Sequence, residues 1–324
     1  MAYHTPAGAP EISIVTPTYN RRDVLLRAIA SVQDQGFREY EHIIIDDGSD
    51  DGTRQAVVSI DDPRLRYLSF DRRRGANAAR NHGIRAARAP LITFLDSDDR
   101  FLRSRLERTV SLFSARPRID VAISSFEVTK GRKSAPAVNR SGHLDSETLE
   151  SLLIAQTLAI AGSAITVRKA ALDAIGGFDE GLWRLQDRDL LLRLAAAGYG
   201  AEILGEIDWV KHGSTDSISR QRGGYVEAYA ALVTRHPRLR ERYPDIVTYM
   251  VARRILSDLV QARFSVALAE MQANRREPSL DFSPSRLVAG YVGGRLRRRR
   301  IAREAKVLAS ATSAGETPPV SVAT

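Results

Sequence analysis

Short apolar runs alternate with amphipathic stretches in the first half of the chain. Four runs have the length and the Ile, Val and Leu content of buried strands: residues 12–16, 41–45, 65–69 and 91–95. Between them, residues 23–33 and 76–87 repeat apolar positions at helical spacing. Strands that alternate with helices are typical of a mostly parallel sheet covered by helices, so this half predicts an α/β fold.

The second half has a more mixed pattern. We predict helices at 102–115, from 146 onward and at 187–197, strands at 120–124 and 164–167, and a mobile polar loop over 130–146. Beyond about residue 217 the pattern predicts only helices, at 224–234, 245–273 and 285–309. The chain therefore divides into a flexible N-terminus (1–10), a main domain (11–220), a helical C-terminal region (221–309) and a disordered tail (310–324).

Three predicted strands end in polar or acidic residues. The first strand ends at Pro17-Thr18-Tyr19-Asn20, the second at Asp46-Asp47-Gly48-Ser49 and the fourth at Asp96-Ser97-Asp98-Asp99. Ligands of open α/β sheets bind outside the carboxyl ends of the strands. We therefore expect the three segments to meet in one crevice.

The acidic segment 96–99 has two interpretations when it is taken alone. Three carboxylates within four residues repel one another, and in extended backbone Asp96 and Asp98 share one face, where a divalent cation could bind them. Carboxylate oxygens suit Mg²⁺ or Mn²⁺. The alternative is a solvent-exposed turn in which Asp98 or Asp99 caps the next helix.

Phosphate recognition would need side chains or a metal here. No glycine-rich phosphate turn follows the first strand, and no P-loop motif is present. Arg80 is a candidate to neutralise phosphate, with an exposed helix arginine as the alternative. Of Asp46 and Asp47, one could face a nucleoside while the other caps the turn, or both could serve the turn.

An ordered set of motifs resembles the family-2 glycosyltransferases of the GT-A fold. Besides the three strand ends, the resemblance rests on Ala79-Arg80-Asn81, Gly176-Gly177-Phe178-Asp179-Glu180 and Gln186-Asp187-Arg188-Asp189-Leu190. It covers roughly residues 11–220. It implies a Rossmann-like, mixed and mostly parallel sheet flanked by helices, with a nucleotide-binding half (11–100), an acceptor half (101–220) and a C-terminal helical extension.

The resemblance also implies an activity: inverting transfer of a sugar from a nucleoside-diphosphate-sugar, in this family often a UDP-sugar, to a hydroxyl acceptor in cell-surface or extracellular glycan synthesis. Mn²⁺ or Mg²⁺ would be the cofactor. The implied nucleotide-sugar-binding residues are Pro17, Thr18, Tyr19, Asp47, Arg80 and Asp96. Asp98 would bind the metal, with His212 as a further ligand, and Asp187 would be the catalytic base.

Asp187 is also notable without the resemblance. It lies in the first turn of a predicted helix whose apolar face is Leu190, Leu191 and Leu194. A helix start stabilises a carboxylate and lowers its pKa, which is an alternative to the role of base. Gln186 stands where many relatives have glutamate.

Composition and charge narrow the setting. The chain contains no cysteine, which excludes disulfides, cysteine-bound metals and a cysteine nucleophile and fits the cytoplasm. We find no signal peptide and no membrane-spanning run. The net charge is +9, and its densest basic run, residues 295–303, predicts either a solvated helix end or contact with an anionic membrane surface. Nucleic acid is disfavoured, because interleaved aromatic residues are missing.

The expected partners are thus a nucleotide-sugar donor, a glycan or lipid-linked acceptor, and the inner face of the plasma membrane. Two other functions are the alternatives. A nucleotidyltransferase-like enzyme would carry a glycine-rich, basic phosphate loop after the first strand, which this chain lacks. A non-catalytic nucleotide-sugar or glycan-binding module would not need both Asp98 and Asp187.

Overall fold

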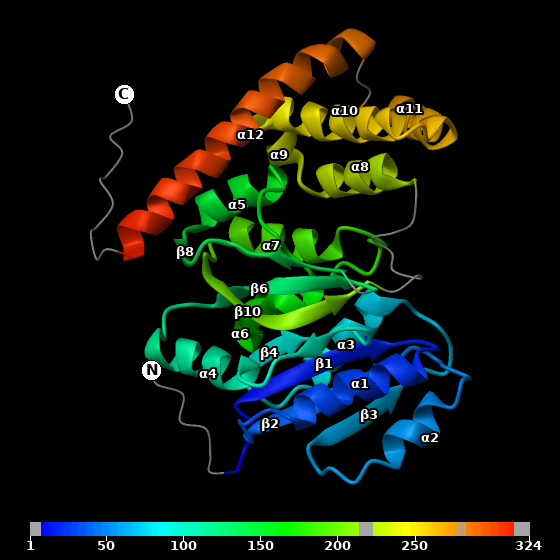
Figure 1. The fold of residues 1–324 in the computed structure, drawn as a ribbon, viewed down its shortest axis with the longest axis vertical. Helices are drawn as coiled ribbons and strands as arrows, with labels where there is room; N and C mark the ends of the chain where they lie inside the picture. The colour runs from blue at the N-terminus through cyan, green and yellow to red at the C-terminus, as the bar shows by residue number, and fades with distance from the viewer. Residues whose placement is uncertain (1–7, 132, 214–222, 278–279, 281–282, 314–324) are drawn as a thin grey trace.

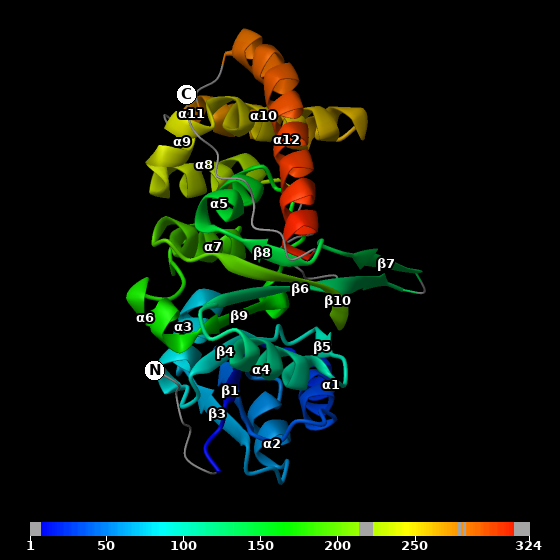
Figure 2. The ribbon, with the colours of Figure 1, turned by 90° about the vertical axis from the view of Figure 1, so that its left-hand side faces the viewer.

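A mixed sheet of ten strands runs through the centre of the molecule (Figures 1 and 2). The computed structural model describes residues 8–131, 133–213, 223–277, 280 and 283–313. Within this part of the chain the strand order is β3-β2-β1-β4-β9-β6-β10-β5, with β7 paired to β6 and β8 to β10. The predicted α/β fold with flanking helices and a C-terminal helical extension is confirmed.

The first half of the sheet is parallel throughout. Its strands are β3 (Leu65–Ser69), β2 (Tyr40–Asp46), β1 (Ile12–Thr18) and β4 (Leu91–Phe94). All residues of β1, β2 and β4 are buried, including polar ones such as Ser13, His42 and Thr93, as expected for parallel strands that are covered on both faces. The helices that connect or follow these strands are α1 (Arg22–Gln33), α2 (Thr53–Val58) and α3 (Ala76–Ala86).

Close packing of α3 on β1 depends on a glycine. A Cβ atom added at Gly83 would lie 2.3 Å from Val15 Cγ1, well inside van der Waals contact. The missing side chain lets α3 approach the strand. Arg80 lies one turn earlier on the same helix, so this contact also fixes the position of a predicted site residue.

The second half of the sheet is mostly antiparallel. β9 (Ile165–Arg168) lies between β4 and β6 (Val121–Lys130) and is antiparallel to both. β10 (Ala201–His212) is parallel to β6, and β5 (Arg100–Phe101) is antiparallel to β10. The helices of this half are α4 (Arg105–Ala115), α5 (Ser146–Ile154), α6 (Lys169–Ala174) and α7 (Gln186–Ala196), and a 3₁₀ turn, η1 (Gly162–Ala164), precedes β9.

The mobile loop predicted over residues 130–146 is wrong. The segment contains β7 (Lys133–Ala137), which pairs with β6, and β8 (Gly142–Leu144), which pairs with β10. Nearly all of β7 is exposed, and among the described strands it pairs with β6 alone. An edge strand needs neither an apolar face nor a free N–H at Pro136, so its composition resembles that of a loop.

The C-terminal region is helical, as predicted, but its helices are divided differently. They are α8 (Tyr225–Arg235), α9 (Pro237–Arg242), α10 (Pro244–Val260), α11 (Phe264–Arg276) and α12 (Pro284–Ser313). The single helix predicted over 245–273 is broken at Ala262, which adopts a left-handed φ of 54°. α12 continues beyond the predicted end at residue 309, while residues 1–7 and 314–324 lie outside the described residues.

The long helix α12 packs on α10 and on β8 (Figure 1). The basic run 295–303 lies within this helix and not at its end. Part of this run faces inward: Arg298 donates to the carbonyls of Ala155 and Gln156, and Arg297 donates to Asp245. Arg295 and Arg299 are exposed. Among the described helices, none combines the length and apolar character needed to cross a bilayer.

Candidate active site

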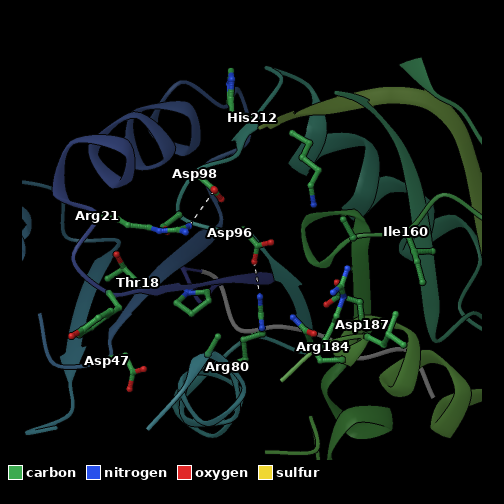
Figure 3. A pocket seen from close by; sticks show the side chains of 18 of the residues that line it. Thr18, Arg21, Asp47, Arg80, Asp96, Asp98, Ile160, Arg184, Asp187 and His212 are labelled. Carbon is green, nitrogen blue, oxygen red and sulfur yellow. Dashed lines mark hydrogen bonds and ion pairs between the residues drawn. The ribbon is translucent and has the colours of Figure 1, made fainter. Parts of the chain in front are cut away.

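A cavity of about 630 Å³ lies at the carboxyl ends of β1, β2 and β4, where the three strand-end motifs were expected to meet (Figure 3). All nine predicted site residues line it: Pro17, Thr18, Tyr19, Asp47, Arg80, Asp96, Asp98, Asp187 and His212. The structure therefore brings the predicted residues together, from segments as far apart in sequence as residues 17 and 212.

The loops after β1 and β2 hold each other in place. Asn20, at a φ of 49°, accepts through Oδ1 from the Asp50 N–H, and its own N–H donates to Ser49 Oγ. Asp46 accepts from the N–H and the hydroxyl of Ser49 and so stabilises the turn. Its neighbour Asp47 lines the cavity instead.

Asp47 is oriented by backbone. Its carboxylate accepts from the N–H groups of Arg74, at 2.6 Å, and Gly75, at 2.8 Å. Nearby, the guanidinium of Arg73 lies 4.5 Å from the ring centroid of Tyr19, and both side chains line the cavity. This end of the cavity therefore combines an aromatic ring, a cation and a fixed carboxylate, which are suitable contacts for a base and a ribose.

The three carboxylates of the acidic segment turn to different partners. Asp96 Oδ1 accepts from Arg80 Nη2 at 2.7 Å, and Asp98 Oδ2 lies 3.2 Å from Arg21 Nη1 (Figure 3). Asp99 is buried and accepts from Ser163 Oγ and from the backbone N–H of His212. Strand β5 follows it, so the idea that Asp99 caps a helix is wrong. Cationic side chains and donors thus offset much of the repulsion that was expected to require a metal.

Two cations, the buried Arg80 and the partly buried Lys211, balance these acids. Burial lowers the pKa of Arg80, which is only 4% exposed, but Asp96 and Asp187 more than compensate and raise it above its ordinary value. Burial likewise lowers the pKa of Lys211, and the carboxylates of Asp99 and Asp96 raise it overall. Burial raises the pKa of Asp96, but Arg80 and Lys211 outweigh burial and hold it below the ordinary value.

Asp187 is presented by a sharp backbone turn. Leu185 adopts a left-handed φ of 63° immediately before α7, and Asp187 is the second residue of that helix. Its Oδ1 atom is buried and has no hydrogen-bond partner within the described part of the chain. Leu190, Leu191 and Leu194 are buried, as predicted for the apolar face.

The expectation that the helix start lowers the pKa of Asp187 is wrong. Burial raises this pKa above its ordinary value, Arg80 opposes the shift, and Asp96 adds to it. Desolvation, which disfavours the charged carboxylate, is the largest cause of the shift. A carboxylate with raised basicity and an uncommitted oxygen is suited to accept a proton.

The donor groups fit a cation that shares its coordination with a substrate. Among the described residues, no three His, Cys, Asp or Glu side chains are grouped so as to hold a metal. Mg²⁺ and Mn²⁺ are commonly bound by one or two carboxylates together with phosphate oxygens of a substrate. Asp98 and Asp96 could provide the carboxylates. The ring of His212 lies at the cavity edge, with Nδ1 2.9 Å from Thr129 Oγ1, so a metal role for it stays a prediction.

Several lining residues were not predicted: Arg21, Arg73, Arg184, Arg188, Lys211 and Tyr225. Arg188 directly follows Asp187, Lys211 directly precedes His212, and Arg21 follows the strand-end motif 17–20, so proximity to predicted residues was a usable signal. Tyr225 belongs to α8, which was assigned to a separate helical region. Only the tertiary fold brings it to the cavity.

A parallel half-sheet with acidic and cationic side chains at its carboxyl ends, extended by an antiparallel half, is the GT-A arrangement of nucleotide-sugar enzymes. Residues 13–176 match the family described as "Glycosyl transferase family 2". The chain belongs to this family.

The most similar regions of curated relatives are short. The succinoglycan biosynthesis protein ExoO of Rhizobium meliloti (strain 1021) is 39% identical over 119 residues, which are 37% of this chain and 34% of that protein. The GalNAc(5)-diNAcBac-PP-undecaprenol beta-1,3-glucosyltransferase of Campylobacter jejuni is 39% identical over 100 residues, 30% of this chain and 32% of that protein. The matches thus span about a third of these relatives.

Solved structures match over nearly the full length. S. aureus TarS 1-349 in complex with UDP-GlcNAc has a TM-score of 0.68 at 16% identity and covers 97% of this chain and 94% of that chain. The mannosyltransferase PcManGT from Pyrobaculum calidifontis, in complex with GDP-Man and Mn²⁺, has a TM-score of 0.59 at 16% identity, with coverages of 95% and 86%. At this identity the likeness establishes the fold.

Proposed function

We propose that the protein is an inverting glycosyltransferase that moves a sugar from a nucleoside-diphosphate-sugar, most simply a UDP-sugar, to a hydroxyl group of a glycan acceptor. The observation that carries the proposal is that Asp187, Asp96 and Arg80 lie in the same cavity as the loops after β1 and β2. TarS, a structural neighbour, has been crystallised with UDP-GlcNAc. Relatives named for succinoglycan and teichuronic acid synthesis suggest a cell-surface or extracellular glycan as the product.

The residues divide the work along the cavity. Tyr19 and Asp47, together with Pro17 and Thr18, would bind the nucleoside, while Arg80 would orient Asp96 toward the ribose and diphosphate. Asp187 would take the proton from the acceptor hydroxyl as that oxygen attacks the anomeric carbon. The nucleoside diphosphate then leaves on the opposite side, so the configuration at that carbon inverts.

Asp98 would hold Mn²⁺ or Mg²⁺ jointly with the donor diphosphate, with His212 as a further candidate ligand. When bound, the cation would stabilise the negative charge that develops on the leaving diphosphate. Arg21 pairs with Asp98, and Lys211 interacts with the carboxylates of Asp96 and Asp98. Both side chains would add positive charge near the cation. The Mn²⁺ in PcManGT accompanies a sugar nucleotide, which supports this assignment.

The decisive experiment is a screen of nucleotide sugars for Mn²⁺-dependent release of nucleoside diphosphate. Asp187→Asn should lose turnover by about a hundredfold or more while UDP binding is retained. Asp173→Asn makes the same change at an exposed position and should have no effect. Near-normal turnover in Asp187→Asn would rule out the base assignment.

The metal assignment has its own test. In Asp98→Asn, UDP affinity should no longer increase on addition of Mn²⁺. An unchanged response to Mn²⁺ would exclude Asp98 as the ligand. The same turnover assay separates the enzyme from a non-catalytic binding module, which would bind UDP-sugars without consuming them.

We also propose that the protein works at the cytoplasmic face of the plasma membrane, held there by α12. The exposed face of this helix places Val288, Val292 and Leu296 beside Arg295 and Arg299. Apolar side chains interleaved with arginines suit an anionic lipid surface. The C. jejuni relative is named for an undecaprenol-linked substrate.

Liposome flotation tests the membrane proposal. The chain should float with anionic vesicles at low salt, and Arg295→Gln/Arg299→Gln should reduce the bound fraction by about tenfold. Neutral vesicles serve as the control. Absence of binding by the wild-type chain at low salt would refute it.

A further inference from the structure

One wall of the cavity belongs to neither the nucleoside end nor the acidic segment. It is built from the loop at Ile160 and Ala161, from residues 184–188 at the start of α7, and from Tyr225 of α8. The proposed base Asp187 is itself part of this wall, and Figure 3 shows it on the same side of the cavity as Arg184 and Ile160, so an acceptor hydroxyl that reaches the base would contact this wall. Its charged side chains are Arg184, Arg188 and Asp187, so cations outnumber acids on this wall.

The positive charge of Arg188 is buried, and the groups around it offset the cost of that burial only in part. It is 8% exposed, and its guanidinium donates to the carbonyl of Leu153. Its Nε is buried and finds no hydrogen-bond partner within the described part of the chain. Burial lowers the pKa of Arg188, and Tyr225, Tyr229 and, to a smaller extent, Asp187 reverse this only in part. A buried cation with an unused donor gains from an anion brought beside it.

Arg184 extends the same positive surface outward. It lies 5.7 Å from the ring centroid of Tyr225, and it donates to the carbonyl of Gly223 at 3.2 Å. Burial lowers the pKa of Arg184, and the positive charge of Arg254 lowers it further. Both effects would be relieved by a bound anion.

Tyr225 of this wall is held in place by residues that do not line the cavity. The hydroxyl of Tyr225 accepts from Gln156 Nε2 at 2.6 Å, and the backbone N–H of Tyr225 donates to Glu270. Gln156 adopts a left-handed φ of 50°, and its carbonyl accepts from Arg298 of α12. The wall is therefore a built surface whose parts come from the catalytic domain and the helical region together.

We propose that this wall is an acceptor subsite for a phosphate ester, so that the acceptor carries a phosphate or diphosphate group close to the hydroxyl that is glycosylated. Arg184 and Arg188 would bind the phosphate oxygens, and Asp187 would then face the hydroxyl. The inference rests on the proposed glycosyltransferase function and names the chemical class of its acceptor. A polyprenyl diphosphate and a polyol phosphate share this chemistry.

Calorimetry with the donor site already filled tests the subsite. In saturating UDP and Mn²⁺, farnesyl diphosphate and glycerol 3-phosphate are titrated separately into the full chain, with farnesol as the neutral control. At least one of the two phosphate probes should bind, and which one binds tells the lipid source from the polyol source. Arg184→Gln should weaken that binding by about tenfold or more, and Arg184→Lys by less.

Matched variants separate recognition from misfolding. Arg238→Gln removes an arginine that is exposed and does not line the cavity, so phosphate binding should be unchanged. Arg188 also donates a hydrogen bond to the carbonyl of Leu153, so Arg188→Gln disturbs the fold as well as the charge. Arg188→Lys, which keeps the charge, is therefore measured beside it. UDP affinity is measured in every variant and should equal that of the wild type.

Three results would overturn the inference: equal affinity of Arg184→Gln and wild type for the probe, equal binding of farnesol and farnesyl diphosphate, or no binding of either phosphate probe by a wild-type chain that binds UDP. Failure of the wild type to bind any nucleoside diphosphate is a different result. It would overturn the proposed function, on which the subsite depends.

Discussion

The contact between Arg80 and Asp96 gives the sharpest prediction, because one substitution changes both stability and its pH dependence. Arg80→Met keeps the apolar stem of the side chain but removes the charged guanidinium. It leaves Asp96 without its 2.7 Å partner and removes the cation that also acts on Asp187. Removing one member of a buried pair costs about 3–5 kcal/mol. Asp96 is 25% exposed to the cavity, so we expect a loss of about 3 kcal/mol at neutral pH.

The sign of the pH dependence follows from the pKa shifts. In the wild type, Arg80 helps to hold the pKa of Asp96 below its unfolded value, so this carboxylate stabilises the fold above its ordinary pKa. That stabilisation is lost as the pH falls through the lowered pKa. Without Arg80, the pKa values of Asp96 and Asp187 both rise. The destabilisation by Arg80→Met should therefore be largest at neutral and alkaline pH and shrink as the pH approaches the ordinary carboxyl range.

Urea unfolding of wild type and Arg80→Met at about pH 8 and about pH 5 measures the effect. Arg80→Met/Asp96→Asn should recover part of the loss, because the uncompensated charge is gone. Arg21→Met, which breaks the more exposed ion pair with Asp98, should cost about 1 kcal/mol or less. If Arg80→Met loses equal stability at both pH values and Asp96→Asn gives no recovery, the loss is one of packing and the electrostatic reasoning is refuted.

Three further predictions concern glycines and the metal. Gly83→Ala should push α3 away from Val15 and lower the free energy of unfolding by about 1–3 kcal/mol, whereas an unchanged melting temperature would contradict the packing described. In Gly162→Ala a methyl group would lie 3.4 Å from carboxylate oxygens of both Asp187 and Asp96. Because the methyl group excludes water, the acid limb of the pH profile of kcat/KM should move to higher pH. An unmoved acid limb would speak against Asp187 as the base. Removing metal with a chelator should weaken UDP binding but not abolish it, because Arg80 and Lys211 remain; complete loss in calorimetry would show that the metal supplies nearly all of the attraction.

The parallel half of the fold was predictable mainly because three of its four strands, β1, β2 and β4, are buried on both faces. The strands β1, β2 and β4 contain only buried residues, and each carries a short stretch rich in Ile, Val, Leu or Phe that indicates a strand. Each run is followed at once by a polar motif. Since the carboxyl ends of parallel strands lie at the same edge, strand order alone was enough to predict that these motifs would share a cavity.

The strand β10 shows why the second half was harder. It pairs with β6 over most of its length, yet register shifts occur between Leu204 and Ile207 and again between Ile207 and Val210. Each irregularity disrupts the alternation of inward and outward side chains, and Gly205, Glu206 and Asp208 interrupt the apolar pattern. The strand was therefore not predicted, and neither was Lys211 near its end.

The unpredicted part of the site depends on long-range contacts. Tyr225 reaches the cavity because α8 packs against α11 and because Gln156 donates to its hydroxyl. The raised pKa of Asp187 depends on burial by distant segments in the same way. A helix start can be recognised from local sequence, but the loss of water around a carboxylate cannot.

Asp96 and Asp187 illustrate how one cavity can give two carboxylates opposite properties. Both have an oxygen 3.4 Å from the Cβ position of Gly162, so they share nearly the same surroundings. Arg80 donates directly to Asp96 and, with Lys211, keeps its pKa low, whereas Asp187 Oδ1 has no such donor within the described residues and its pKa is raised by burial. A carboxylate that stays ionised suits the cationic, phosphate-binding side of the reaction, and one that holds a proton more readily suits the acceptor hydroxyl. The direction in which Arg80 points thus determines which of the two acids can act as the base.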